Sequence, residues 1–273
     1  MEQKRDKLPV FYIPHGGGPW HVMGDAFGGA VGYARLKNYL VDFGNQFNKK
    51  IKAILVISAH WEEVFPTVYF GSNPPLLYDY YGFPESTYHL SWSAFGNPGL
   101  AERIEYLLKT SGFTAKREYK RGFDHGTFVP LMLAFPKPEI PVIQLSLVKT
   151  LDPETHINLG KALEPLRNEG VLIIGSGMSY HNMRGFMSGE TRTSENSEKF
   201  DNWLAKTVLS TDIQERNTAL MNWQKAPSAL ECHPRSEHLV PLFVIAGAAG
   251  DDTGLIDYAG TLLGVKISGY KFG

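Results

Sequence analysis

Short apolar runs rich in β-branched residues alternate along this chain with segments of helical period, and this alternation most constrains its fold. Residues 54–57 (ILVI) and 171–174 (VLII) are apolar without interruption, which is typical of strands buried on both faces of a central sheet. The expected strands are Pro9–Pro14, Ala53–Ser58, Thr67–Tyr69, Pro141–Leu147, Val171–Ile174 and Val265–Tyr270.

The segments between these runs predict helices. Asp124, Asp152 and Ser194 are suitable N-cap residues, because their side chains can accept from the free N–H groups of a first turn. The expected helices are Ala30–Phe47, Gly99–Thr110, Thr127–Phe135, Pro153–Arg167, Ser197–Leu209 and Glu237–Gly247. The alternation favours an α/β fold, a three-layer α/β/α sandwich around a central, mostly parallel or mixed sheet.

Two segments lack a clear period. Gly71–Pro98, rich in Tyr, Gly, Pro and Ser, is interpreted either as a surface excursion or as a loop over a site, and Gly185–Ser197 is expected to be a loop. Neither is a linker between independent units, and there is no internal repeat, so we expect residues 1–273 to form one domain.

Composition excludes several function classes. A hydrophobic fraction of 43% argues against disorder, and a net charge of -1 gives no bulk attraction to nucleic acid or to an anionic membrane. Cys232 is the only cysteine, which excludes an intrachain disulfide and a thiolate metal cluster. With no signal-like or membrane-spanning apolar stretch, the expectation is a cytoplasmic protein, monomeric or a small homo-oligomer.

Five of the nine histidines lie where an expected strand gives way to a Gly/Pro-rich turn or to a helix start. They are His15, His60, His125, His181 and His238. Ligands bind beyond the carboxyl ends of the strands in open α/β sheets, and imidazole is both a common metal ligand and a proton carrier near neutral pH. The sequence therefore predicts a metal centre with general-base chemistry beside it.

Each of these positions has a second interpretation. His15, followed by three glycines, could be a turn histidine bound to backbone; a phosphate loop is disfavoured because the Gly-x-Gly-x-x-Gly order and the P-loop lysine are missing. His60 beside Trp61 could be ordinary packing. Glu237 and His238 are consecutive, about 100° apart on a helix, so we expect only one of them to be a ligand and leave open which.

The remaining histidines have weaker contexts. His156 lies in an amphipathic segment and is expected to be solvated, whereas His233 is expected to be structural. His89, in the Tyr-rich segment, is a lesser candidate for substrate contact. Gly175-Ser176-Gly177 is interpreted as a tight turn, and Ser176 lacks the Gly-x-Ser-x-Gly context of a hydrolase nucleophile.

Taken together, these segments resemble the class III extradiol ring-cleavage dioxygenases, especially the 4,5-DOPA-dioxygenase-like branch. The matching segments, in the family's order, are 14–19 (PHGGGP), 57–61 (ISAHW), 123–127 (FDHGT), 144–147 (QLSL), 175–182 (GSGMSYHN) and 237–242 (EHLVPL). The His-Gly-Gly-Gly turn departs from the His-Gly-Ser-Pro of many bacterial members, and the substrate motif of the plant relatives is missing from residues 175–184. Both departures leave the substrate open.

The resemblance implies a non-haem iron(II), with zinc able to occupy the same site, bound by His15, His60 and His238. It implies that His181 is a base or a further ligand and that His125 is a second active-site histidine. A related branch uses a carboxylate as third ligand, which keeps Glu237 open.

The implied reaction opens the ring of a catechol-type substrate with dioxygen to a muconic semialdehyde. We expect His181 to take a catechol proton and His125 to donate a hydrogen bond. Trp20, Trp61 and Tyr88 are either walls of the site or core. The competing functions are a zinc hydrolase with the same histidines and a non-catalytic binding protein on the same fold.

Overall fold

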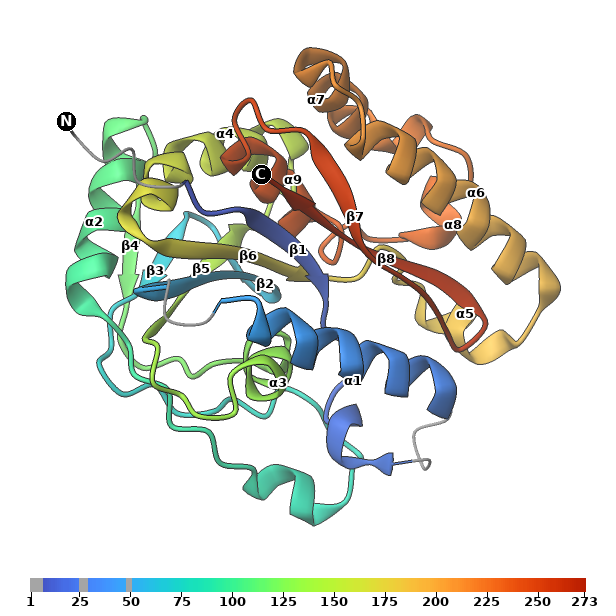
Figure 1. Cartoon of the computed structure of the whole chain (residues 1–273), viewed down its shortest axis with the longest axis horizontal. Helices are drawn as coiled ribbons and strands as arrows, with labels where there is room; N and C mark the ends of the chain where they lie inside the picture. The colour runs from blue at the N-terminus through green and yellow to red at the C-terminus, as the bar shows by residue number, and fades with distance from the viewer. Residues whose placement is uncertain (1–6, 25–28, 48–50) are drawn as a thin grey trace.

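A computed structural model describes residues 7–24, 29–47 and 51–273, and its described strands form one eight-stranded mixed sheet in the order β4-β3-β5-β2-β6-β1-β8-β7 (Figure 1). The strands are β1 (Val10–Pro14), β2 (Ala53–Glu63), β3 (Thr67–Tyr69), β4 (Lys116–Glu118), β5 (Val142–Val148), β6 (Val171–Gly177), β7 (Gly254–Leu262) and β8 (Val265–Phe272). The four central strands β5, β2, β6 and β1 are parallel, whereas β8 runs antiparallel to β1 and to β7.

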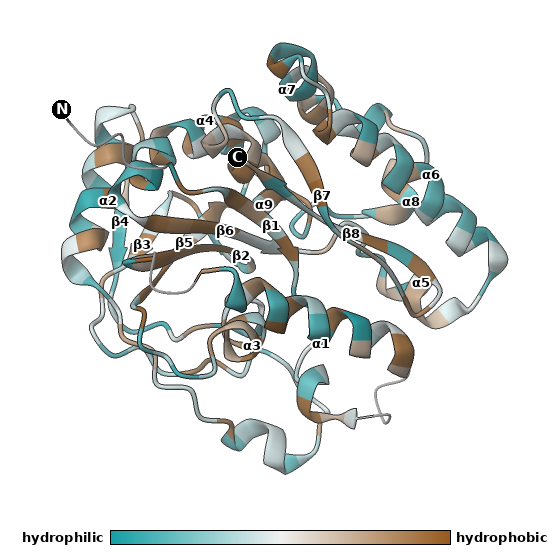
Figure 2. Cartoon of the chain, viewed as in Figure 1, coloured by the Kyte–Doolittle hydropathy of each residue, from teal (hydrophilic) through white to brown (hydrophobic). Residues whose placement is uncertain are grey.

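The hydropathy of the strands follows their place in the sheet. Every residue of β1, β5 and β6 is buried, and their apolar residues give the central strands much of their brown colour in Figure 2. β7, at the edge, alternates largely between buried and exposed residues because one of its faces meets solvent. The uninterrupted apolar runs thus mark strands that are covered on both faces.

Helices cover both faces of the sheet, which gives the three layers seen in Figure 1. α1 and α3 lie on one side, and α4 and α9 on the other. α9 is apolar and buried along its whole length because it packs against β1, β2 and β6. The α-helices are α1 (Ala30–Asn45), α2 (Pro98–Thr110), α3 (His125–Ala134), α4 (Pro153–Leu163), α5 (Met183–Ser188), α6 (Thr191–Val208), α7 (Ile213–Met221), α8 (Ala229–Cys232) and α9 (Val240–Ala248). Short 3-10 helices span Trp20–Val22, Glu85–His89, Glu164–Glu169 and Trp223–Lys225. No helix of the described residues is long and apolar enough to cross a membrane.

The predicted α/β sandwich is confirmed. All six expected strands and all six expected helices are present, Thr67–Tyr69 with the expected bounds and the others with shifted ends. The expected loop at Gly185–Ser197 is wrong, because α5 and the start of α6 occupy it. Residues 175–177 belong to β6 and are not a turn. The helix expected from Glu237 begins at Val240. β4, β7, α7 and α8 were not predicted. The expectation of one domain over residues 1–273 stays a prediction.

The expected solvent exposure of His156 is also wrong. This side chain is fully buried, with Nδ1 2.7 Å from the Asp152 carbonyl oxygen and Nε2 accepting from the Val148 N–H at 3.0 Å. Both ring nitrogens therefore have partners, which removes the usual cost of burying a polar ring.

Candidate metal and catalytic centre

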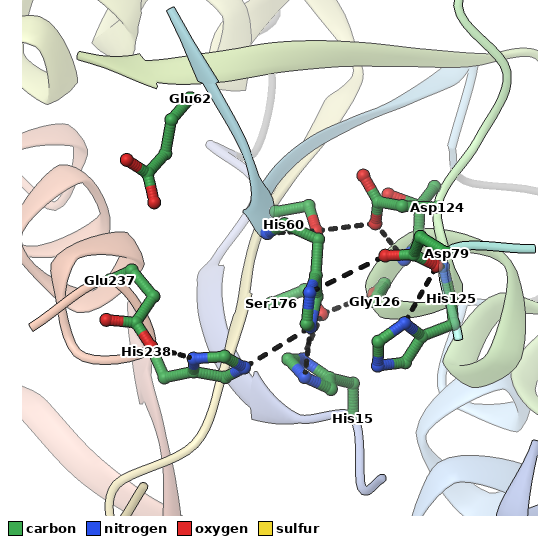
Figure 3. Close-up of polar contacts among 12 residues, drawn as sticks. His15, His60, Glu62, Asp79, Asp124, His125, Gly126, Ser176, Glu237 and His238 are labelled. Atoms are coloured by element: carbon green, nitrogen blue, oxygen red, sulfur yellow. Dashed lines mark hydrogen bonds and ion pairs between the residues drawn. The ribbon is translucent and has the colours of Figure 1, made fainter. Parts of the chain in front are cut away.

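Three adjacent parallel strands bring their carboxyl ends to one edge of the sheet. β1 leads directly into His15, β2 carries His60, and β6 between them carries Ser176 (Figure 3). His60 lies where the β2–β5 register breaks between Ile57 and Glu62, an irregularity of the kind that redirects a side chain. β2 therefore continues past His60, which was expected to end the strand.

Two glycines make room for this arrangement. Gly16 has φ 76°, and a Cβ there would collide with the Trp20 ring, whose Nε1 donates to the His15 carbonyl at 2.7 Å. A Cβ on Gly177 would collide with the His238 carbonyl. Gly16 thus allows Trp20 to pack against the turn after β1, and Gly177 allows the segment before α9 to pack directly onto β6.

The Nε2 atoms of two imidazoles, His15 and His238, lie close to that of His60 (Figure 3). The His60 Nε2 lies 3.1 Å from that of His15 and 3.2 Å from that of His238. Nitrogen ligands about 2.0–2.1 Å from one ion lie about 2.8–3.4 Å apart, so both distances fit a shared metal. The His238 position is notable because it comes from a segment more than 170 residues from His60.

The partners of the opposite ring nitrogens fix where the protons are. Ser176 donates its only hydroxyl proton to the Gly126 carbonyl, so at 3.1 Å it must accept from the Nδ1–H of His15. The Glu237 carboxylate accepts from His238 Nδ1 at 3.0 Å. The Nε2 atoms of His15 and His238 therefore both carry lone pairs, and a proton on the His60 Nε2 could satisfy only one of them. A cation between the three nitrogens resolves this conflict, and oriented partners of this type are usual for metal-ligating histidines.

Burial keeps these rings neutral. It lowers the pKa of His15 and His238 well below 6.5, and neighbouring imidazoles add to the effect. Burial also lowers the pKa of His60 to about 4, with His125 as the next cause. Because neutral imidazole is the form that binds metal, all three side chains are ready to ligate at pH 7.

A buried carboxylate holds the backbone around His60. Asp124 accepts from Ser58 Oγ at 2.6 Å, from Arg121 at 3.0 Å and from the Gln144 amide. Arg121 also donates to the His60 carbonyl at 2.9 Å. Asp124 was predicted only as the N-cap of α3, a role that its contact with the Thr127 N–H confirms.

His125 is held by Asp79, which sequence reasoning missed. One Asp79 oxygen lies 2.8 Å from both the backbone N and the Nδ1 of His125 (Figure 3). Burial would raise the pKa of Asp79, but the contacts with His125 hold it below the usual value. With Nδ1 as donor, the second ring nitrogen donates only in the doubly protonated form. The signal for Asp79 was present: it is the only charged residue in 71–84.

His181 shares a carboxylate with His238. Its Nδ1 lies 3.1 Å from Glu237 Oε1, and its ring stacks on that of His238 with centroids 3.4 Å apart. Burial opposes the negative charge of Glu237, yet its contacts, first that with His181, lower its pKa. An ionised Glu237 accepts the Nδ1 proton of His181, which leaves the Nε2 of the neutral ring as a proton acceptor.

The five histidines, named here the histidine floor (His15, His60, His125, His181 and His238), form one side of a cavity of about 420 Å³. Asp79, Tyr80, Tyr81 and Phe83 also line it, so the segment 71–98 does overhang the site. Two groups of side chains in the described residues could hold a metal: His15, His60 and His125, and His181, Glu237 and His238. The floor thus offers more ligand atoms than one ion needs.

Other sequence candidates lie outside this cavity. His89 is exposed and pairs with Glu85 at 2.9 Å, so it does not line the pocket, whereas buried His233 contacts the Ser179 carbonyl at 2.9 Å, as expected of a structural residue. Trp20 and Trp61 belong to the core and Tyr88 packs against it. None of these aromatic residues lines the cavity.

Comparison with known proteins gives consistent matches. Residues 33–266 match the family described as the catalytic LigB subunit of aromatic ring-opening dioxygenase. The chain is 44% identical over 211 residues to a 4,5-DOPA dioxygenase extradiol of Beta vulgaris, covering 76% of each. It is 35% identical over 280 residues to the dioxygenase tasH of Hapsidospora irregularis, covering 97% of this chain and 85% of the relative. A solved structure of an uncharacterized Escherichia coli K12 protein shares the fold, with a TM-score of 0.79, 24% identity and coverage of 97% and 100%.

Proposed function

This chain belongs to the class III extradiol ring-cleavage dioxygenase family, and we propose that it is an iron(II)-dependent enzyme that opens a catechol-type ring with dioxygen to a muconic semialdehyde. One observation carries the proposal. The Nε2 atoms of His15 and His238 both lie within 3.2 Å of that of His60, at the bottom of a cavity large enough for a substituted catechol.

The proposed ligands are His15, His60 and His238. Glu237 is proposed as the partner that orients His238 and His181, because its Oε1 lies within 3.1 Å of both Nδ1 atoms. When bound, ferrous iron supplies coordination positions and an electron path for a catecholate and dioxygen. The donor set also suits zinc, which we expect to occupy the same site without supporting the oxidation.

His181 is the proposed general base. Its contact with Glu237 leaves Nε2 as the proton acceptor, and His181 lines the cavity. A catechol hydroxyl that reaches this nitrogen can pass on its proton, and such help typically contributes about 10²–10⁴-fold. The protonated ring is then stabilised by the carboxylate that it already contacts.

His125 is proposed to position the reacting molecules on the opposite side of the floor. Asp79 holds its Nδ1 and its backbone N, so the ring is fixed while its second nitrogen is left for a substrate oxygen or dioxygen. It donates there when the ring carries both protons.

An oxygen electrode tests the proposed reaction. The protein reconstituted with iron(II) should consume oxygen with one or more members of a catechol panel, and yellow ring-opened product should accumulate in equimolar amount to the oxygen used. Turnover should stop under nitrogen. A product that forms equally fast without oxygen would contradict the proposal and favour a zinc hydrolase. If no catechol on the panel binds or reacts, the non-catalytic alternative is favoured. The expected cytoplasmic location and monomeric or small homo-oligomeric state stay predictions.

A further inference from the structure

Much of the cavity lining outside the floor is apolar. Six of its side chains come from three separate segments: the 71–98 segment, the short helix α5 and the turn between β7 and β8. We name them the apolar mouth: Tyr81, Phe83, Met183, Phe186, Met187 and Leu263. In α5, positions 183, 186 and 187 are three and four residues apart, so they share one face of the helix.

The mouth keeps large apolar side chains in solvent. Tyr81 is 92% exposed, Met187 81% and Met183 58%. Exposed apolar side chains gathered at the rim of a pocket commonly mark a binding surface. Methionine is suited to such a surface because its flexible, polarizable side chain adapts to different apolar shapes.

None of the described residues that line the cavity is a lysine or an arginine. Two arginines near the floor are paired with carboxylates: Arg121 contacts Asp124, and Arg235 contacts Glu62 at 2.5 Å and Glu237 at 3.4 Å. Arg184 is exposed on α5 and does not line the cavity. A substrate carboxylate buried within the cavity would therefore lose water without a lysine or an arginine of the lining to pair with, which is costly.

The carboxylate that lines the cavity is also engaged already. Asp79 is the only carboxylate among the described lining residues, and it already accepts twice from His125 and lies 3.5 Å from the His60 Nδ1. A substrate ammonium could pair with it only by displacing the contacts that hold the floor. The described lining of the cavity thus provides no lysine or arginine for a carboxylate and only an already engaged carboxylate for an ammonium.

We propose that the substrate is a catechol whose ring substituent is uncharged and apolar, an alkyl or aryl group seated in the apolar mouth. This inference rests on the proposed function and narrows it. The proposed substrate differs from the DOPA in the names of the relatives, because the DOPA side chain carries both an ammonium and a carboxylate.

A substrate series on the iron-loaded enzyme tests the proposal. The series is 4-methyl-, 4-ethyl-, 4-propyl- and 4-butylcatechol, compared with dopamine, 3-(3,4-dihydroxyphenyl)propionate and L-DOPA. We expect kcat/KM to rise about two- to fourfold for each added methylene. The charged compounds should fall about tenfold or more below the alkylcatechol of matching length. If L-DOPA or the propionate were turned over as efficiently as the propyl compound, the inference would be overturned.

A charge placed at the rim gives a second test. Met187→Lys should narrow the preference for the propyl compound over the propionate, expressed as a ratio of kcat/KM values, by about fivefold or more, because the lysine offers the missing cation. Tyr106→Lys is the matched control: Tyr106 lies on α2, is 58% exposed and is outside the cavity, so its ratio should match that of the wild type. An unchanged ratio in Met187→Lys would contradict substrate contact with α5.

Binding measurements separate the two proposals. Calorimetry on zinc-loaded protein without oxygen should show 4-butylcatechol binding more tightly than L-DOPA. If catechols are turned over but L-DOPA is preferred in both the turnover and the binding measurements, only the inference of an apolar substituent is overturned. Absence of oxygen-dependent turnover with every compound would overturn the proposed function itself, whichever compound binds more tightly.

Discussion

The histidine floor and the apolar mouth line one cavity, but they are built differently. The floor comes from the carboxyl ends of buried parallel strands and from residues beside α3 and α9, and its side chains are held by Ser176, Glu237 and Asp79. The mouth comes from α5 and connecting segments outside the sheet, and several of its side chains are largely exposed. The difference indicates that the sheet determines the chemistry, whereas peripheral segments determine which substituent fits.

Removing a proposed ligand should have the largest effect. His60→Ala removes the nitrogen that lies between those of His15 and His238, so bound iron or zinc should fall below about a tenth of the wild-type content and activity should be lost. Metal analysis after desalting measures this. His89→Ala, at an exposed histidine outside the cavity, should retain both. Full metal occupancy in His60→Ala would contradict the proposal that the histidine floor binds the metal.

Removing the proposed base should separate metal binding from turnover. His181→Ala should keep its metal but lose about 10²–10⁴-fold in kcat, since Glu237 still orients His238. Metal content and steady-state kinetics on the same preparation give the two readings. Loss of metal together with activity would instead make His181 a ligand.

Acid should destabilise the protein through a buried histidine that lies outside the floor. Burial lowers the pKa of His156 from 6.5 to about 4, so between these values the unfolded chain binds more protons and the free energy of unfolding falls as pH falls. At pH 5 this one residue should cost about 2 kcal/mol relative to pH 7.5. His156→Gln should lose that part of the pH dependence, as measured by urea unfolding.

Urea unfolding of the metal-free protein tests whether the effect of His156 comes from its burial and not from metal binding at the floor. The difference in pH dependence between wild type and His156→Gln should persist without metal, because His156 contacts only backbone groups. His89→Gln is the matched control, and its unfolding should follow the wild-type pH dependence. A difference that vanishes on metal removal would mean that His156 is coupled to the floor.

Weakening a partner of the floor should have a moderate effect. Glu237→Gln keeps the shape of the side chain but removes the charge that holds two imidazoles. Metal affinity should fall about 10–100-fold, as measured by competition with a chelator. Glu231→Gln, at an exposed position on α8, should leave the affinity unchanged, and equal affinities in the two variants would contradict the orienting role.

The smallest effect should come from trimming the mouth. Met183→Ala preserves helix propensity in α5, and with 4-butylcatechol as substrate its KM should rise about two- to fivefold. Metal affinity and kcat should stay within error of the wild type, because Met183 contributes to the cavity without belonging to the floor. A loss of metal in this variant would show that mouth and floor are not separable.

The floor could be predicted from sequence because two local patterns fix it. Apolar runs identify the central strands, and the histidines follow those strands or begin helices, so their meeting at one edge is a consequence of the parallel sheet. The local pattern left open whether Glu237 or His238 is a ligand, and the family resemblance implied His238. The Nε2 contact with His60, which local sequence does not contain, supports His238 as the proposed ligand.

The mouth could be predicted only in part: the segment 71–98 was recognised as a possible loop over a site, but the helix α5 was expected to be a loop and neither segment indicates its partners. Asp79 reaches His125 across 46 residues of chain, and α5 falls in a polar stretch that has the composition of a loop.

Ser176 was considered only as a nucleophile, yet its role depends on the β1–β6 register that pairs Ile13 with Ser176. His156 was misjudged because helical amphipathicity does not reveal that Val148 supplies a donor to it.

The position of β1 in the sheet has a consequence for biosynthesis. β1 ends at Pro14, but its neighbours β6 and β8 begin only at Val171 and Val265. At roughly 5–20 residues per second of translation, the first strand is synthesised roughly 8–30 s before β6 can pair with it. The apolar strand β1 therefore stays unpaired and prone to aggregation during most of translation. Binding of a chaperone to the nascent chain should raise the yield of folded enzyme.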